Sequence, residues 1–325
     1  MFPMNEASWA KHIPIIEDTG IDGFELNFGC PHGMSERGMG AAVGQVPEYI
    51  KQATEWCKKY ATVPVIVKLT PNITDVIYPA EACLEGGADA VSLINTINSI
   101  MRVDYDSLTM FPTTGGMGTH GGYCGEAVKP IALNMVAEIA RNEKTKNLPI
   151  SGIGGVTTWK DAVDFIALGA SNVQVCTAAM VYGFKIVEDM KTGLSNFLDE
   201  KGMNSVDELI GKAVPSVTDW KFLNLNHVDK AVIDQEKCIK CGRCHIVCED
   251  TSHQAIKYSD DGGNRVFTVD DNECVGCNLC VSVCPIVDCI TMVAMESGID
   301  PRTGKEITSE PADWTTHENN PMKVS

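Results

Sequence analysis

Two short runs of cysteine carry the clearest chemical signal in the sequence. The spacing C-x2-C-x2-C-x3-C occurs at 238–248 and again at 274–284. Three thiolates this close in a loop can bind one iron–sulfur cube, while the fourth lies on a departing turn and reaches the other cube. The repeat therefore predicts two [4Fe-4S] clusters. The expected ligands are Cys238, Cys241, Cys244 and Cys284 for cluster one, and Cys274, Cys277, Cys280 and Cys248 for cluster two.

Other uses of cysteine explain the pattern less well. Structural zinc is the alternative, because paired cysteines of this spacing also bind zinc. A zinc site does not need two identical runs of four thiolates, so the repeat favours iron–sulfur clusters. A disulfide framework is typical of small secreted proteins. This chain has 325 residues, and its first residues show no secretory signal.

The segments around the two runs complete a small domain. Residues 254–258 and 265–269 alternate in polarity on either side of a Gly/Asp/Asn turn, which predicts a β-hairpin. We therefore expect a ferredoxin-like domain over 230–300. The polar residues 301–325 are expected to form an extended or disordered tail.

A second set of chemically useful residues stands at the ends of short β-branched segments. Those segments lie at 23–27, 63–69, 88–95, 149–154 and 172–176, and they end near Asn27, Lys68, Asn95, Gly154 and Cys176. Helical patterns separate them at 46–60, 75–85, 127–142 and 159–168. Repeated βα units predict a parallel sheet. Functional residues at the carboxyl ends of its strands are typical of a (β/α)8 TIM barrel.

The length of this region indicates an incomplete barrel. A full barrel takes about 250 residues, whereas five βα units account for the chain before the cysteine runs. The chain opens on a helical stretch over 5–19, so we expect three βα units to be lacking at the front. The expected boundaries are a barrel portion over 1–185 and a helical linker over 186–229.

Composition and charge narrow the class of protein. Hydrophobic residues make up 44% of the chain, which is typical of a globular protein. The formal net charge of −17 argues against a nucleic-acid partner, since such partners require a basic surface. No apolar run approaches the roughly 18 residues that span a bilayer. We therefore expect a soluble, cytoplasmic protein with no membrane partner.

The segment 25–34, which reads ELNFGCPHGM, resembles the active-site loop of dihydropyrimidine dehydrogenases. That family is similar to dihydroorotate dehydrogenases but carries an appended two-cluster ferredoxin module. Further similar segments follow in the family's order along the chain. They are found at 68–72, 95–96, 125–132, 152–156 and 283–290.

The resemblance implies an FMN- and iron–sulfur-dependent oxidoreductase of pyrimidine catabolism. Uracil or thymine would be reduced to the 5,6-dihydropyrimidine. The electrons would come from NAD(P)H through an FAD- and NAD(P)H-binding partner subunit, and would pass through the two clusters to FMN. The resemblance is to the bacterial catalytic-subunit type, which we expect to form an oligomer.

Cys30 is the expected catalytic residue, since the resemblance makes it the general acid. Pyrimidine reduction needs a hydride at one carbon of the double bond and a proton at the other. A free thiol has a pKa of about 8.5 and so carries a proton at neutral pH. The alternative is a buried cysteine that only fills space.

Amide and hydroxyl groups near the strand ends are expected to bind substrate. The candidates are Asn27, Asn95 and Thr96. A carboxamide offers a donor and an acceptor without charge, which suits the edge of a uracil ring. The alternative is that these asparagines only form turns.

The remaining candidates would hold FMN. Lys68 ends an apolar segment, and its cation would stabilise the reduced flavin near N1 and C2, unless it only reaches solvent. Glycine backbone and neighbouring residues at strand ends suit a phosphate. These cofactor candidates are Gly154, Gly155, Cys176 and Thr177, with Gly125 at the end of a glycine-rich segment, 113–125. That segment is expected to form a lid or a loop that covers the flavin, and the alternative is a plain flexible loop.

Two other functions stay open from the sequence. The substrate could be dihydroorotate, whose carboxylate would need a cation, and Arg102 is the candidate for it. The chain could also be a non-catalytic electron carrier, with a ferredoxin-type module attached to a degenerate barrel.

Overall fold

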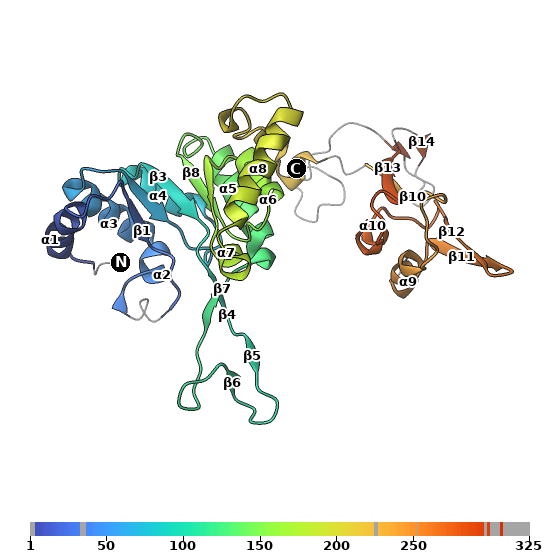
Figure 1. Cartoon of the computed structure of the whole chain (residues 1–325), viewed down its shortest axis with the longest axis horizontal. Helices are drawn as coiled ribbons and strands as arrows, with labels where there is room; N and C mark the ends of the chain where they lie inside the picture. Colours follow the sequence, from blue (N-terminus) through green and yellow to red (C-terminus); the bar gives the residue numbers. More distant parts are fainter. Residues whose placement is uncertain are drawn as a thin grey trace, which may run out of the picture. The chain divides into compact units, whose positions relative to one another are not determined.

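The computed structural model describes residues 4–32, 37–223, 227–251, 253–295, 298–299 and 306–307. The chain divides into two compact units, Met1–Val217 and Thr218–Ser325 (Figure 1). Gly33 and Met34 of the active-site-like segment lie outside the described residues. So does the predicted tail, except for β15 (Glu306–Ile307), which pairs with β14 (Gly298–Ile299).

The first unit is built on a parallel sheet. Its strands are β1 (Phe24–Asn27), β2 (Val65–Lys68), β3 (Ala90–Leu93), β8 (Ile150–Ile153) and β9 (Asn172–Gln174). They lie in the order β1-β2-β3-β8-β9, and every neighbouring pair is parallel. Each strand therefore lies next to its neighbour in the chain of βα units, which is the arrangement in the wall of a βα barrel. The five predicted strands are all present.

Helices follow the strands and bury one face of the sheet (Figure 1). Val67 and Leu93 of the sheet are fully buried against helix residues such as Ile50 and Phe165. Thr158 begins α6 with a capping box to Asp161, which fixes where that helix starts. The helices of this unit are α1 (Glu6–Glu17), α2 (Ala41–Gly44), α3 (Pro47–Tyr60), α4 (Ile77–Glu85), α5 (Lys129–Arg141), α6 (Trp159–Ala167), α7 (Thr177–Tyr182) and α8 (Ile186–Glu200).

The segment predicted as a helical linker contains α8, which packs on α6. Phe197 and Trp159 have ring centroids 5.8 Å apart. The chain then continues through short 3-10 turns. They are η3 (Val206–Glu208), η4 (Val214–Ser216) and η5 (Trp220–Phe222), while η2 (Glu126–Val128) precedes α5.

Between β3 and α5 the chain forms a long antiparallel arm that extends away from the sheet (Figure 1). Strand β4 (Ile97–Ser99) pairs with β7 (Gly121–Tyr123), and β5 (Arg102–Val103) pairs with β6 (Met110–Phe111). Most of the glycine-rich segment 113–125 belongs to this arm. Its last residues, 123–125, line the pocket described below, and a role of the segment as a lid or cover for the flavin stays a prediction.

The second unit combines two antiparallel pairs with two short helices. Strand β10 (Asp229–Ile233) pairs with β13 (Ile290–Ala294), and β11 (Ile256–Asp261) pairs with β12 (Asn264–Val269) around a Gly-Gly turn. The predicted hairpin is thus present. Helix α9 (Arg243–Asp250) carries Cys244 and Cys248 of the first run, and α10 (Leu279–Val283) carries Cys280 of the second. Among the residues that the structure describes, no helix is both long and apolar enough to cross a membrane.

Candidate functional site

A row of polar side chains crosses the parallel sheet at a single register. The paired positions are Asn27, Lys68, Ser92, Ser151 and Asn172, one from each strand. Because side chains alternate between the two faces of a strand, a row at one register lies on one face. The apolar neighbours before and after these residues pack against the helices, so the polar row lies on the opposite face.

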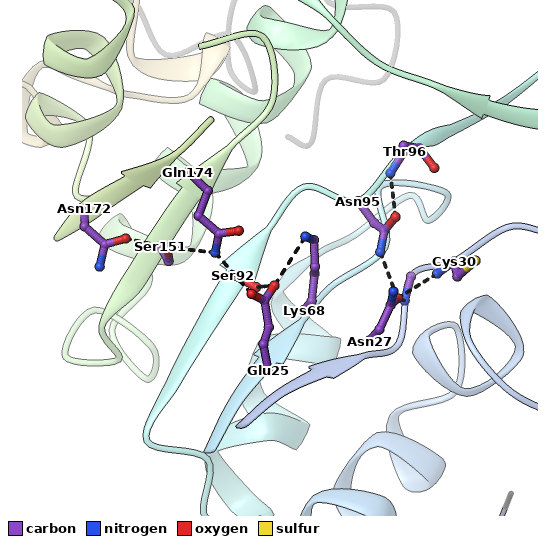
Figure 2. A network of polar contacts seen from close by, with 11 residues as sticks. Glu25, Asn27, Cys30, Lys68, Ser92, Asn95, Thr96, Ser151, Asn172 and Gln174 are labelled. Atoms are coloured by element: carbon purple, nitrogen blue, oxygen red, sulfur yellow. Dashed lines mark hydrogen bonds and ion pairs between the residues drawn. The ribbon is translucent and has the colours of Figure 1, made fainter. Parts of the chain in front are cut away.

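Glu25 joins several strands through this polar face (Figure 2). Its Oε1 atom lies 3.3 Å from Lys68 Nζ and accepts a hydrogen bond of 2.8 Å from Ser92 Oγ. Gln174 Nε2 donates to Glu25 Oε2 at 3.4 Å and to Ser151 Oγ at 3.0 Å. The carboxylate therefore fixes the positions of two side chains, Lys68 and Gln174, that line the pocket described below.

Asn27 organises the segment that carries Cys30 (Figure 2). Asn27 Oδ1 accepts from the backbone N–H groups of Gly29 and Cys30, at 3.2 and 3.1 Å, and from Asn95 Nδ2 at 2.9 Å. Asn95 Oδ1 accepts from the N–H of Thr96 at 2.8 Å. Three predicted substrate residues and the predicted acid are thus brought together by one chain of hydrogen bonds.

Cys30 faces a histidine of the same loop. Its Sγ atom lies 3.5 Å from His32 Nδ1. His32 Nε2 in turn accepts from the N–H of Gly122 at 3.4 Å, at the base of the arm. The arm also touches this loop through His120, whose Nε2 lies 3.0 Å from the carbonyl oxygen of Pro31. The arm therefore supports the loop that carries the thiol.

A pocket of about 670 Å³ lies at the carboxyl ends of β2, β3, β8 and β9. This volume is typical of a small-molecule or cofactor site. All the predicted cofactor residues line it, together with two of the predicted substrate residues. They are Lys68, Gly125, Gly154, Gly155, Cys176 and Thr177, with Asn95 and Thr96. Cys30 and Asn27 do not line the pocket but connect to it through Asn95.

Two features of the pocket fit a flavin with a phosphate. Thr96 Oγ1 is buried and has no hydrogen-bond partner among the described residues, so it is a group that a ligand can satisfy. Gly155 has a φ of +73°, and a Cβ there would lie 2.8 Å from Lys129 Cβ and 2.9 Å from the Gly125 carbonyl oxygen. Glycine thus lets the backbone form a tight cradle whose N–H groups suit a phosphate.

Replacing Gly155 with alanine is expected to weaken FMN binding by more than about tenfold, since a factor of ten needs only about 1.4 kcal/mol. The added Cβ would displace Lys129 or the Gly125 backbone. Gly20→Ala is the matched control, because Gly20 has a similar φ of +81° but nothing within 4 Å of the added Cβ. Fluorescence titration of the apoprotein with FMN measures both affinities, and equal affinities for the two variants would contradict the prediction.

Glu25→Leu is expected to lower the free energy of unfolding by about 1–3 kcal/mol, because Lys68 and Ser92 lose the acceptor that they share. Both members of this ion pair are largely shielded, with 21% and 33% of their side chains exposed. The control is Glu188→Gln in an exposed pair with Lys191, where the expected change is below about 0.5 kcal/mol. Urea unfolding measures both, and a result in which the two variants match would disprove this view of Glu25.

The cysteines of the second unit line two separate cavities. Cys274, Cys277, Cys280 and Cys248 line one, and Cys238, Cys241, Cys244 and Cys284 line the other. The fourth cysteine of each run thus lies with the first three of the other run, as the spacing predicts. No three His, Cys, Asp or Glu side chains of the described residues surround a point where a single metal ion could bind. Four cysteines at each of two cavities is the donor set that a pair of [4Fe-4S] cubes requires.

Sequence reasoning missed Glu25, Gln174 and Asn72 as residues of this site. Asn72 Nδ2 donates to the Thr96 carbonyl oxygen at 3.1 Å, and Asn72 Oδ1 accepts from the N–H of Asn98. A charged residue inside a buried strand was the available signal for Glu25. For Gln174 the signal was a polar residue at alternate positions of the last strand.

Arg102, the candidate cation for a carboxylate substrate, lies on the arm. Its guanidinium carbon is 4.0 Å from the centroid of the Phe111 ring. It does not belong to the residues that line the pocket. The geometry therefore gives the dihydroorotate alternative no cation at the place where it was expected.

Comparison with known proteins matches both units. The dihydroorotate dehydrogenase family profile matches residues 4–198, and a 4Fe-4S dicluster domain matches residues 231–292. The NAD-dependent dihydropyrimidine dehydrogenase subunit PreA of Escherichia coli K12 is 40% identical over 89% of this chain and 69% of its own length. The chloroplastic dihydropyrimidine dehydrogenase (NADP(+)) of Arabidopsis thaliana is 40% identical over 73% of this chain and 56% of its own length.

Two further proteins match a smaller share of the chain. The catalytic subunit of dihydroorotate dehydrogenase B (NAD(+)) of Thermococcus kodakarensis is 41% identical over 59% of this chain and 60% of its own length. A crystal structure of dihydroorotate dehydrogenase from Eimeria tenella has a TM-score of 0.52 at 22% identity, and covers 64% of this chain and 59% of that one. This likeness concerns the fold, and with the cluster-domain match it confirms the predicted fold class.

Proposed function

We propose a function from the premise that this chain belongs to the dihydroorotate dehydrogenase family and, within it, to the dihydropyrimidine dehydrogenase subunits. The chain is an oxidoreductase that reduces uracil or thymine to the 5,6-dihydropyrimidine. The observation that carries this proposal is the pocket at the strand ends, where the cofactor candidates meet the amides connected to Cys30. A second, FAD- and NAD(P)H-binding subunit supplies the electrons, consistent with the name of the E. coli relative as a subunit.

The residues that would hold FMN divide between its two ends. The backbone at Gly154 and Gly155, with Cys176 and Thr177 beside it, would bind the phosphate. The ammonium of Lys68 would lie near the flavin N1 and C2, where it stabilises negative charge. The chemistry that FMN supplies when bound is hydride transfer to the pyrimidine ring.

The carboxamides of Asn27 and Asn95 keep N–H groups that can donate to a pyrimidine after their hydrogen bonds within the protein are made. Asn27 uses its oxygen on the Cys30 loop and keeps its N–H groups, while Asn95 keeps one N–H. Donors of this kind can bind the carbonyl oxygens of uracil without adding charge to the site. Asn27 therefore has two tasks in this proposal: it orients the thiol loop and it contacts substrate.

Cys30 delivers the proton to the ring carbon that does not receive hydride. The neighbouring imidazole of His32, 3.5 Å from the sulfur, can return a proton to the thiolate after each turnover. The loop is also in contact with the base of the arm. Closure of such a loop over the ring would exclude water during proton transfer.

A single-turnover experiment tests the proposed substrate. The flavin of the purified chain is reduced with light and deazaflavin, and its reoxidation is then followed after addition of uracil or of orotate. Uracil is expected to reoxidise the flavin and yield dihydrouracil, and orotate is not. Reoxidation by orotate would instead support the dihydroorotate alternative, and a purified chain that binds no flavin would leave only electron transfer.

A further inference from the structure

We propose that Lys230 raises the reduction potential of cluster two above that of cluster one, so that the first electron to enter the second unit settles on cluster two. The inference rests on the proposed pair of [4Fe-4S] clusters and goes beyond it by ranking them. It rests on two observations: the charge of Lys230 is buried beside the loop of cluster two, and the matching position of the internal repeat carries no charge.

Lys230 is buried at the base of the loop that carries the cysteines of cluster two. It lies in β10 and is 5% exposed. Its Nζ atom donates to the carbonyl oxygens of Cys274, at 2.6 Å, and Asp271, at 2.8 Å. The same loop packs on the start of β10, since a Cβ at Gly276 would lie 2.7 Å from the Asp229 carbonyl oxygen. The ammonium therefore binds the backbone of Cys274, which is itself an expected ligand of cluster two.

The two halves of the unit repeat each other with an offset of 36 residues, from Cys238 to Cys274. The loops match in conformation as well as in spacing. Lys240 and Gly242 have positive φ angles of 61° and 81°, and the matching Gly276 and Asn278 have 70° and 63°. The repeat therefore identifies, for each residue near one cluster, its counterpart near the other.

The counterpart of Lys230 is Val266, on β12. Lys230 precedes Asp234 by the same number of residues by which Val266 precedes Asp270. The backbone carbonyl oxygen of each aspartate accepts from the N–H of the first cysteine of its run, at 3.0 Å in both halves. A buried cation thus contacts the loop of cluster two, whereas an uncharged side chain occupies the matching position of the repeat.

Cations near cluster one are exposed to solvent. Arg243 lines the cavity of cluster one, but the residue is exposed. The Lys237 side chain is 51% exposed and lies 3.7 Å from the carboxylate of Asp234. Water and salt screen exposed charges far more than buried ones. The ammonium of Lys230 is therefore the least screened of these cations.

The direction of the effect follows from the charge of the reduced cluster. One electron from the donor adds one negative charge to the cube, with no bond made or broken in the protein. A nearby cation in a poorly solvated place stabilises that extra charge and so raises the potential. The expected difference is about tenfold or more in the reduction equilibrium, which is about 59 mV for one electron.

The test is a redox titration of the purified whole chain, followed by electron paramagnetic resonance. The wild-type chain is expected to show two midpoint potentials. Lys230→Gln keeps hydrogen-bond donors but removes the charge, so the upper potential is expected to fall by about tenfold in equilibrium, about 59 mV, toward the lower one. Lys230→Arg keeps the charge and is expected to leave both potentials in place.

Lys230→Met provides a second neutral variant, with an unbranched side chain, should the glutamine variant lose a cluster. A role of Lys230 in holding the loop alone would lower the cluster content without moving the upper potential selectively. The inference is overturned by a single midpoint potential in the wild type, by an unchanged upper potential in the neutral variants, or by equal shifts of both. Failure of the proposed clusters is distinguishable, because iron and sulfide analysis of the wild type would reveal it before any titration.

Discussion

Cys30→Ala is expected to slow pyrimidine reduction by about 10²- to 10⁴-fold, the range that a positioned general acid contributes. The hydride step needs a proton on the neighbouring carbon, and no other residue of the described loop places an acidic thiol there. Asn27 holds the loop through two backbone N–H groups that do not depend on the side chain of residue 30. The alanine variant should therefore keep the fold, the flavin and the clusters.

The measurement is a single turnover of the pre-reduced chain with uracil, in which flavin reoxidation and dihydrouracil are both followed. Cys30→Ser keeps the shape of the side chain with a much weaker acid, so its rate should fall almost as far as that of the alanine variant. Flavin content and iron content serve as controls for both variants. A rate within about threefold of wild type, less than the smallest contribution expected of a general acid, would remove Cys30 from the chemistry.

The sheet could be predicted from the sequence because its strands carry two signals: a β-branched segment and a polar or functional residue near the end of that segment. A segment such as 63–69 is rich in β-branched residues and has a polar residue, Lys68, next to its end, and the structure places β2 at Val65–Lys68 within it. The arm could not be predicted in this way. Strands β5 and β6 have two residues each and are mostly exposed, so they show no alternation that sequence reasoning could detect. Their pairing depends on the antiparallel arm as a whole.

Those parts of the site that single residues or their spacing indicate could be predicted. Those parts that depend on the register between neighbouring strands could not. Spacing alone indicated that Cys248 and Cys284 exchange between the runs. The glycines of the pocket were found because they follow strands. Glu25 was missed because its partners, Ser92 and Gln174, are 67 and 149 residues away in the sequence. Only the register of the strands shows that these side chains share a face. The roles of Lys68, Asn95 and the other site residues stay predictions until variants are measured.

Cys277→Ala is expected to reduce NAD(P)H-driven turnover, measured with the partner subunit present, by more than about 100-fold. Cys277 lines the cavity of cluster two, and loss of one thiolate from a site of four removes the cluster or its function. Single turnover of the photoreduced flavin with uracil bypasses the clusters, so it should stay within about threefold of wild type, the scatter expected of a site that the substitution does not touch. The contrast between the two assays separates electron delivery from pyrimidine chemistry.

Cys289→Ala is the matched control for this prediction, because Cys289 is a cysteine of the same unit that borders the cavity of cluster one but stands outside the two runs. Burial and the neighbouring Cys284 together raise the pKa of its thiol to about 12, so at neutral pH it stays protonated and is a poor cluster ligand. The control variant should keep both clusters and its NAD(P)H-driven turnover. If Cys277→Ala instead kept full NAD(P)H-driven turnover, the clusters would not lie on the route of the electrons, because a chain that no longer holds cluster two could not then deliver them at the normal rate.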